Sequence, residues 1–377
     1  MGLHDLLKLT WWGVLGVVLV AAATLMGSDM GVGALLRTVA RDDAERRACL
    51  NAIGPHWEGN QTWFVLAGGA SFAAFPLLYA TAFSALYPVM LLLLWSMLLR
   101  PLGFEYRSKL PQRAWREAWD WALVLGSALP MLLLGAAFSQ LLLGVRFDLD
   151  WSLRSRHTPG AGALPHPFAA LCGALALALA ALQGAATLAR CCRGAVALRA
   201  RRVGCAAAAA ALALFAGASI WVGHLDGWIL LSHAGDAASQ TPLRQQVLVR
   251  QGAWRLHFVQ LPLLWLLPAL GALGMLGALA CLRRDRARAA WHCGTLAWAG
   301  VLGTAGASLF PFLLPSSTHP QHSLTLWNAA SSCAALLWMT GFAAVLLPLV
   351  AWYTRWCLRA MRGPAGRGAS GPGDHAA

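Results

Sequence analysis

The chain has 377 residues, of which 58% are hydrophobic and only 12% carry a charged side chain. A soluble domain of this length usually has about a quarter charged residues, so most of this chain does not face water. The net charge of +14 would favour nucleic-acid binding in a soluble protein, but here the arginines lie in short clusters between apolar segments, as in the loops of a membrane protein.

Nine segments are apolar over about the 20 residues that a membrane-spanning helix needs. The second and third of them are expected to be joined by a very tight turn near Pro76. The sequence therefore predicts an all-α polytopic membrane protein with one transmembrane domain over residues 1–362. The Gly-rich, polar segment 363–377 is predicted to be a disordered cytoplasmic tail. In chain order the predicted spans are 10–27, 59–76, 78–99, 118–142, 167–189, 203–225, 257–281, 290–313 and 333–354.

The basic residues are distributed unequally between the two sets of loops. If the N-terminus lies outside, most of the 29 Lys and Arg residues fall in the inside loops and the C-terminal segment. Because cytoplasmic loops carry the excess of Lys and Arg, this distribution predicts a periplasmic N-terminus, a cytoplasmic C-terminus and an odd number of spans. Adding or removing one span would remove this asymmetry in Lys and Arg, so the asymmetry favours nine spans.

The densest polar group near the membrane is the stretch 56–63, at the start of the second predicted span. At 3.6 residues per turn, Glu58 shares a helix face with Gln61 or Thr62. A carboxylate just inside the bilayer and flanked by amides suits a proton path, since low dielectric favours proton exchange near neutral pH. An acid in a first helical turn is also stabilised by the helix dipole alone, and spacing does not decide between the two roles.

Asp29 lies among the glycines of the segment Gly27–Gly33. One interpretation is an acid in a turn that ends the first span, where glycines relieve crowding. The other is a buried acid near the inner face that pairs with an arginine or takes part in proton supply. The structural interpretation is favoured.

Glu105, Arg107 and Lys109 lie in a loop predicted to be cytoplasmic. They can be ordinary topogenic charges with local ion pairs, each of which contributes little. They can also form the mouth of a proton path to Glu58, because both groups lie near the same membrane face. From the residues alone the first interpretation is favoured.

The sequence gives little indication of a metal bound by this chain. A haem iron needs an axial ligand such as His or Met inside the membrane. His56, His224, His257 and His292 lie near span ends, but no two share a helix at i, i+4 spacing. The nine cysteines form no CxxC pair and lie mostly in apolar segments, which favours neither zinc nor disulfides. We expect no cofactor bound by this chain alone.

Several of these motifs occur together and in a fixed order over nearly the whole chain. The pair formed by Pro55–Gln61 and Gly103–Lys109 is the most specific. With the others, this pair resembles subunit II of cytochrome bd ubiquinol oxidases. The matching segments are Gly27–Gly33, Arg41–Arg47, Asn51–Trp63, Ala67–Ala70, Ala80–Ser84, Arg100–Lys109, Trp119–Trp121, Gly252–Trp254, Phe310–Thr318 and Ser323–Trp327.

The resemblance implies two four-helix bundles plus one peripheral helix, in a bacterial inner membrane. It implies a heterodimer with a homologous subunit I, which carries haems b558, b595 and d and the quinol-oxidising loop. Small single-helix accessory subunits are further expected partners, besides membrane lipid; nucleic acid is not. Such a complex oxidises quinol near the outer face, reduces dioxygen to water and takes protons from the cytoplasm, which generates a proton-motive force without pumping. A quinone is bound by this subunit in some members.

The resemblance also implies roles for particular positions. Those matching Glu58, Glu105 and Lys109 are associated with a cytoplasmic proton path into the large subunit, and the one matching Trp63 lies near a proposed route for dioxygen. Many members have a further acid where this chain has Met26, so a role that rests on that acid is in doubt here. The other residues that carry the motifs are His56, Trp57, Asn60, Gln61, Arg100 and Arg107.

Two other classes of function compete with this one. A secondary transporter or ion channel would have inverted repeats or charges near the bilayer midplane, whereas the acids here lie near the inner face and no repeat is evident. The chain has no Walker A motif, which argues against an ATP-driven pump. The third class is an assembly subunit whose acids have no part in proton transfer.

Overall fold

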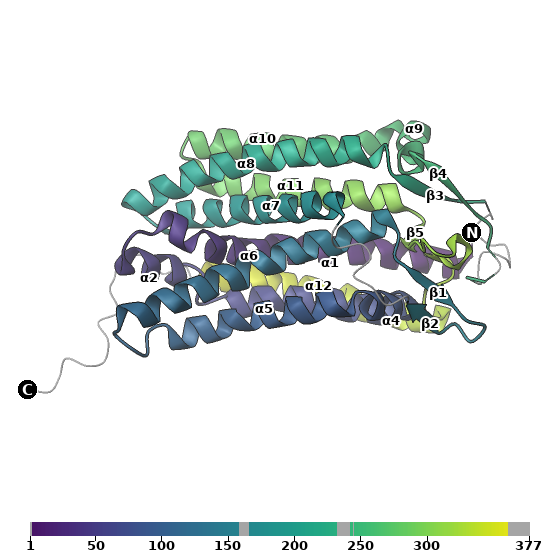
Figure 1. Ribbon diagram of the computed structural model, residues 1–377, viewed down its shortest axis with the longest axis horizontal. Coiled ribbons are helices and arrows are strands. Elements are labelled where there is room, and N and C mark those ends of the chain that lie inside the picture. Colours follow the sequence, from purple (N-terminus) through teal and green to yellow (C-terminus); the bar gives the residue numbers. More distant parts are fainter. Residues whose placement is uncertain (1, 158–165, 232–241, 244, 361–377) are drawn as a thin grey trace, which may run out of the picture.

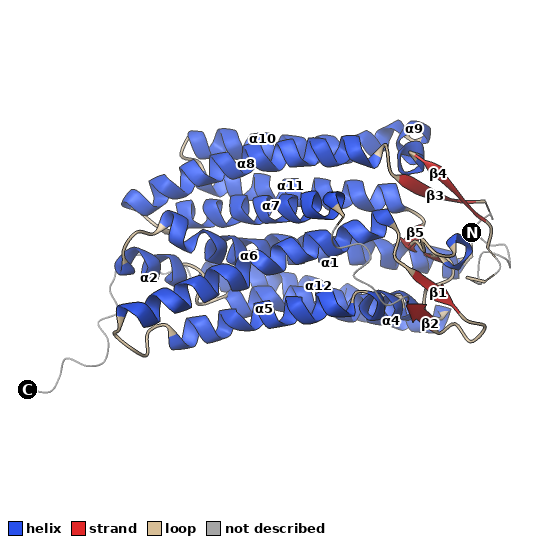
Figure 2. Cartoon of the chain, in the orientation of Figure 1, coloured by secondary structure: helices blue, strands red, loops and turns tan. Residues whose placement is uncertain are grey.

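The computed structural model describes residues 2–157, 166–231, 242, 243 and 245–360. Long helices run side by side along one axis, and short strands gather at the end where the N-terminus lies (Figure 1 and Figure 2). The predicted all-α membrane class is confirmed. The predicted disordered tail, 363–377, lies outside the described residues.

The described residues form nine long helices and three shorter ones. Seven of the long helices are each apolar enough to cross a membrane, and the bent pair α3 and α4 makes an eighth candidate. The eighth predicted span, 290–313, is present as the less apolar helix α11, which packs along α10 and α7. The helices are α1 (Leu3–Val39), α2 (Asp43–Asn51), α3 (Trp57–Ala74), α4 (Pro76–Ala85), α5 (Tyr87–Tyr106), α6 (Arg113–Leu143), α7 (Pro167–Cys191), α8 (Gly194–Val222), α9 (Leu256–Gln260), α10 (Leu266–Arg283), α11 (Ala287–Leu309) and α12 (Cys333–Ala360).

The long helices pack as two groups of four. Helices α1, α3, α5 and α6 form one group, and α7, α8, α10 and α11 form the other. Contacts of α7 with α1 and α6 join them, while α12 rests on α1 and α3 only lightly. This arrangement agrees with the two bundles and one peripheral helix that the resemblance implied.

Helix α1 is longer than the predicted span 10–27, and the segment Gly27–Gly33 lies inside it. The interpretation of Asp29 as an acid in a turn is therefore wrong. The glycines allow close helix packing: a Cβ atom on Gly31 would lie 1.8 Å from the carbonyl oxygen of Ala180, and one on Gly184 would lie 2.3 Å from the backbone of Gly31. Small residues at such a crossing let two membrane helices approach closely.

Two prolines change the predicted second and third spans. Helices α3 and α4 are bent by 120° at Phe75, directly before Pro76, as the predicted tight turn required. The predicted span 78–99 is divided between α4 and α5, with the break at Leu86. Pro88 lies in the first turn of α5, where its missing N–H is tolerated, so it favours a new helix start.

Three antiparallel two-stranded sheets cover the end of the molecule that holds the N-terminus (Figure 2). The last sheet follows α11, in the segment where Pro311 and Pro315 prevent the helix from continuing. The backbone N–H of Ser316 donates to the Ser323 hydroxyl at 3.0 Å, so hydroxyl groups replace part of the lost helical bonding. The sheets pair β1 (Phe147–Leu149) with β2 (Ser155–His157), β3 (Asp226–Leu230) with β4 (Val247–Gln251), and β5 (Phe312–Leu314) with β6 (Leu324–Thr325).

The opposite end brings the basic connections together. Helix α2 begins with an aspartate cap, because the Asp42 side chain accepts from the N–H of Glu45 at 2.8 Å. Arg199 of α8 pairs with the Glu45 carboxylate, and Arg201 pairs with Asp285 beyond α10 at 2.8 Å. We call this end, formed by α2 and the connections α5–α6, α7–α8 and α10–α11, the basic end.

Candidate functional site

A buried acid links α1 and α3 near the basic end. Asp29 of α1 is 1% exposed, and Asn60 of α3 donates to its Oδ2 atom at 2.9 Å. The Nδ1 atom of His56, the residue directly before α3, lies 4.0 Å from Oδ1 of the same carboxyl group. The structure thus places two predicted motif residues around Asp29, although they lie far from it in the sequence.

A buried guanidinium group completes this cluster. Arg100 of α5 is 1% exposed and interacts electrostatically with Asp29. Its Cζ atom lies 5.7 Å from the ring centre of Trp57 and 5.9 Å from that of Phe104, within the range of cation–π attraction. The two rings stack on each other with centres 5.1 Å apart. Acid, amide, guanidinium and aromatic rings therefore form one interior site, which we call the Asp29 cluster.

A second charged cluster lies where α2, α5 and α6 meet. Arg107, 1% exposed, donates from Nε to Oδ1 of Asp120 at 2.6 Å and from Nη2 to Oδ1 of Asp43 at 2.8 Å. Asp120 is fully buried and also accepts from Arg46 at 2.9 Å. Buried charges are rare unless they are paired and hydrogen-bonded, as these are. The network fixes α2 against α6 and against the end of α5, where the Arg100–Lys109 motif lies.

The electrostatics of Asp43 keep this network charged. Partial burial acts to raise the pKa of the Asp43 carboxyl group. The hydrogen bond from Arg107 and the positive charges of Arg107, Arg116 and Arg47 act more strongly and hold the pKa below its ordinary value. Asp43 is therefore ionised at neutral pH and couples three arginines.

Sequence reasoning did not select Asp43, Arg46 or Asp120 as site residues. A signal for Asp120 was present, because it is an acid between two tryptophans at the start of an apolar helix. An acid in such a place is costly without a partner, and the partner proves to be Arg107. Asp43 and Arg46 gave no comparable signal, since both belong to a run of alternating charges.

Of the residues predicted for a proton path, Asp29 is buried, whereas Glu58, Glu105 and Lys109 lie on the surface. Lys109 and Glu105 form an i, i+4 pair at 3.2 Å, with side chains 56% and 67% exposed. Glu58 lies exposed in the first turn of α3, on the same side as Thr62, whose hydroxyl donates to the Glu58 carbonyl at 3.1 Å. The structure thus separates these three residues from the buried Asp29 cluster; Gln61 is half-buried beside them.

Trp63 lies at the contact of three helices. It is 7% exposed, and its ring packs on Ala22 and Leu25 of α1. Its indole N–H donates to the hydroxyl of Thr354 in α12 at 3.1 Å. Trp63 is therefore one of the few residues that fasten the peripheral helix to α1 and α3.

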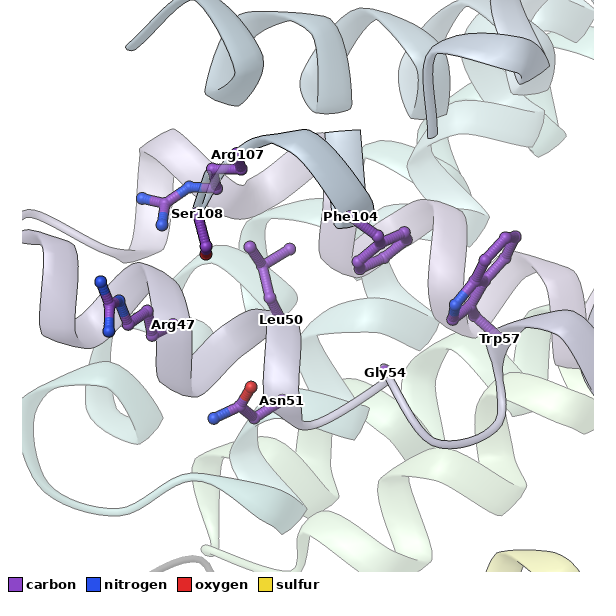
Figure 3. A pocket seen from close by; sticks show the side chains of 8 residues that line it. All are labelled: Arg47, Leu50, Asn51, Gly54, Trp57, Phe104, Arg107 and Ser108. Atoms are coloured by element: carbon purple, nitrogen blue, oxygen red, sulfur yellow. The ribbon is translucent and has the colours of Figure 1, made fainter. Parts of the chain in front are cut away.

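A pocket of about 410 Å3 opens between α2, the turn that follows it and the last turn of α5 (Figure 3). Asn51 and Gly54 line it on the side of that turn. Figure 3 shows the guanidinium groups of Arg47 and Arg107 at one end and the rings of Trp57 and Phe104 at the other. The pocket therefore borders both charged clusters.

Most of the chain matches one family of respiratory proteins. Residues 7–361 match the family described as cytochrome bd terminal oxidase subunit II. This chain belongs to that family. Cytochrome bd-I ubiquinol oxidase subunit 2 of Escherichia coli (strain K12) is 42% identical over 361 residues, 96% of this chain and 95% of that protein. A probable cytochrome oxidase subunit 2 of Haemophilus influenzae is 39% identical over 360 residues, again 96% and 95% of the two proteins.

A solved structure agrees with the fold. A chain of the bd oxidase from Geobacillus thermodenitrificans superposes with a TM-score of 0.68 at 16% identity, over 94% of this chain and 98% of that chain. As a member of the subunit II family, this chain is a subunit of a terminal quinol oxidase, a multi-subunit oxidoreductase complex that contains haem. Family membership and the apolar helices make it a bacterial inner-membrane protein.

Three of the described histidines make contacts within the protein. His166 caps α7, accepting from the N–H of Phe168 at 3.1 Å, and His224 bonds the Ile220 carbonyl at the same distance. His322 accepts from a backbone N–H in the strand-covered end. Among the described residues, no group of three or more His, Cys, Asp or Glu side chains could hold a metal ion.

Proposed function

We propose that this chain pairs with a haem-bearing subunit I in a complex that oxidises quinol near the outer face and reduces dioxygen to water. Protons for that reduction come from the cytoplasm, so the complex generates a proton-motive force without pumping. The collection of arginines at the basic end supports a cytoplasmic position for that end, and therefore a periplasmic N-terminus. Haems b558, b595 and d belong to subunit I in this proposal.

One observation carries the proposed proton path. The exposed side of α3 is a stripe at three- and four-residue spacing: Glu58, Thr62, Val65, Gly69 and Phe72. Its apolar residues need lipid or protein cover, but a carboxylate on a lipid-facing stripe is costly. Gly69 has open space beside it, so another helix can approach closely. We infer that subunit I covers this stripe and that Glu58 passes protons to it.

The exposed pair of Glu105 and Lys109 lies on the cytoplasmic side in this orientation. An acid in contact with water and beside a mobile ammonium group can collect protons and supply them to Glu58 through water. Asp29 lies deeper and contributes a buried acid whose hydrogen bond with Asn60 holds it in place. We propose that Asp29 sets the electrostatic potential on the buried side of α3 and exchanges protons with groups there.

Trp63 is the proposed residue on the dioxygen side. Its ring lies in an apolar contact between α1, α3 and α12, and α12 is the helix least covered by the rest of the chain. Dioxygen is apolar and reaches such contacts from the bilayer. A small movement of α12 would open or close a route beside the Trp63 ring.

Replacing Glu58 tests the proton path. Glu58→Ala in the complete complex should lower oxidase turnover about tenfold or more while the haem content stays normal, since a positioned proton-transfer group contributes at least that much. Glu117→Ala is the matched control, because Glu117 is an acid at the same end that forms an ion pair with its own helix neighbour Arg113. Normal turnover in Glu58→Ala, with the complex assembled, would reduce the chain to an assembly role.

A difference spectrum tests the assignment of the haems. Membranes that contain this chain with its subunit I should give bd-type bands in a reduced-minus-oxidised spectrum, and membranes with this chain alone should give none. Haem bands from this chain alone would make one of its own histidines a ligand.

A further inference from the structure

The pocket at the basic end has two chemically different ends (Figure 3). The guanidinium groups of Arg47 and Arg107 lie at one end, and the stacked rings of Trp57 and Phe104 form the other. Leu50 lies between them and adds to the apolar surface. A ligand that fills the space would need an anionic group joined to an apolar body.

The charged end has an excess of positive charge. Four arginines share two aspartates there, which leaves two positive charges uncompensated. The low pKa of Asp43 means that this count holds at neutral pH. The ion pairs join Arg46, Arg47, Arg107 and Arg116 to Asp43 and Asp120.

Arg107 has a donor left over within this network. Its Nε and Nη2 atoms serve the two aspartates, whereas its Nη1 atom is buried and has no hydrogen-bond partner among the described residues. A buried donor without a partner costs about 1–3 kcal/mol, so a bound anion would satisfy a group that the chain leaves open. Arg47, half-exposed across the pocket, supplies a second guanidinium group. Guanidinium groups bind phosphate well because their planar donors match its oxygens.

The aromatic end lies where the lipid interface is expected. Trp57 begins α3 and Phe104 lies in the last turn of α5, both at the ends of apolar helices. Trp side chains favour the level of the lipid headgroups, where one side is apolar and the other polar. Buried Arg100 lies behind the two rings and fixes their stacked orientation.

We propose that this pocket binds the headgroup of an anionic glycerophospholipid. The phosphate lies against Arg47 and Arg107, and the glycerol and first acyl carbons lie on Leu50, Trp57 and Phe104. Basic pockets between helices on the cytoplasmic side of a membrane suit acidic lipid headgroups. A free phosphate ion offers the same charge but leaves the aromatic end uncovered. The proposal is independent of the proton path.

The test uses the intact oxidase complex, stripped of lipid in detergent. Mixed micelles of dioleoylphosphatidylglycerol, mixed micelles of dioleoylphosphatidylcholine, or inorganic phosphate are added back. Lipid retained by the complex is counted by native mass spectrometry. Stabilisation of the complex by the added lipid or phosphate is measured as an increase in its melting temperature. Two variants address the two ends: Arg47→Gln removes charge, and Leu50→Trp fills the space without changing charge. Arg113→Gln is the control, because Arg113 is exposed and lies outside the pocket.

Phosphatidylglycerol should be retained and should raise the melting temperature more than phosphatidylcholine or phosphate. Arg47→Gln should weaken that binding about fivefold, the equivalent of about 1 kcal/mol for one basic residue near an anionic headgroup. Leu50→Trp should remove it, and Arg113→Gln should leave it unchanged. Equal losses in Arg47→Gln and Arg113→Gln, retention in Leu50→Trp, or no preference for phosphatidylglycerol over phosphatidylcholine would each overturn the proposal. Equal protection by inorganic phosphate would replace the lipid with a free ion and overturn it too.

Discussion

The basic end contains two sets of charged residues that differ in their surroundings. Asp29, Arg100, Arg107 and Asp120 are each at most 1% exposed and lie between helices. The pair of Glu105 and Lys109 has side chains more than half exposed, although it follows Arg100 on the same stretch of chain. Neighbouring positions of one sequence motif therefore serve different purposes.

Burial decides what each set of charged residues can do. A buried charge is held by its partners, and removing one partner leaves the other uncompensated in a medium of low dielectric. An exposed pair is surrounded by water, so it contributes little to stability but exchanges protons freely. The buried set should therefore control stability and internal potential, and the exposed set should control proton supply.

The largest effect is expected from breaking the pair of Arg107 and Asp120. Asp120→Ala removes a fully buried carboxylate that accepts from two arginines, and it should cost about 3–5 kcal/mol of stability. The measurement is the melting temperature and yield of the purified complex. Asp120→Asn keeps the volume and one acceptor oxygen, so it should cost less and yield folded protein.

The control for this pair lies one turn away. Glu117→Ala breaks an exposed i, i+4 pair with Arg113, so it should leave the melting temperature nearly unchanged. If Asp120→Ala and Glu117→Ala melt at the same temperature, burial does not distinguish the two sets and the comparison fails.

The next effect is expected at Asp29. Asp29→Asn keeps the size of the side chain but removes the charge that faces Arg100, and it should lower oxidase turnover about tenfold, or about 1.4 kcal/mol in the barrier. Arg100→Gln should behave similarly. If the two residues act as a pair, the double variant should be no slower than either single variant, because coupled residues are not additive. Additive losses would show that Asp29 and Arg100 act separately.

Much of the fold followed from the sequence because membrane helices are set by composition. Each of the nine apolar segments overlaps a long helix, although the third is divided between α4 and α5, and Pro76 marks the sharp turn after α3. The glycines after residue 26 were consistent with a turn as well as with a helix contact, since glycine favours both turns and close packing. Only the position of Ala180 and its neighbours opposite Gly31 decides for packing.

The residues of the site could be predicted in part, but its geometry could not. The motifs selected Asp29, Asn60, Arg100 and Arg107, which the structure buries, and Glu58, which it exposes. Spacing along a helix cannot reveal which face another helix covers. The contact between Asn60 and Asp29 joins helices α1 and α3, and such a contact is visible only once the chain is folded.

A smaller effect is expected from acid at Asp43. Its folded-state pKa lies below the ordinary value of 3.8, so the carboxylate stabilises the fold at higher pH and loses that contribution as the pH falls below 3.8 toward the folded value. The melting temperature of the complex should therefore begin to fall near pH 4 and continue to fall as the pH is lowered further. Asp43→Asn should reduce this dependence, and an unchanged profile would mean that other acids cause it. Asp150→Asn is a comparison, since Asp150 also has a lowered pKa but lies at the strand-covered end.

The smallest effect on stability is expected at the exposed pair. Glu105→Gln or Lys109→Gln removes a single i, i+4 ion pair and should change the free energy of unfolding by about 0.5 kcal/mol or less. Turnover is the more informative measurement. The loss should be moderate, because water and neighbouring groups can replace an exposed proton-collecting acid in part. We expect Glu105→Gln to lower turnover by about two- to threefold. The corresponding increase in the activation free energy is smaller than the roughly 1.4 kcal/mol of a tenfold loss. A loss as large as that of Asp29→Asn would mean that the exposed pair, rather than the buried cluster, limits proton delivery, and the division of roles between the two sets would have to be reversed.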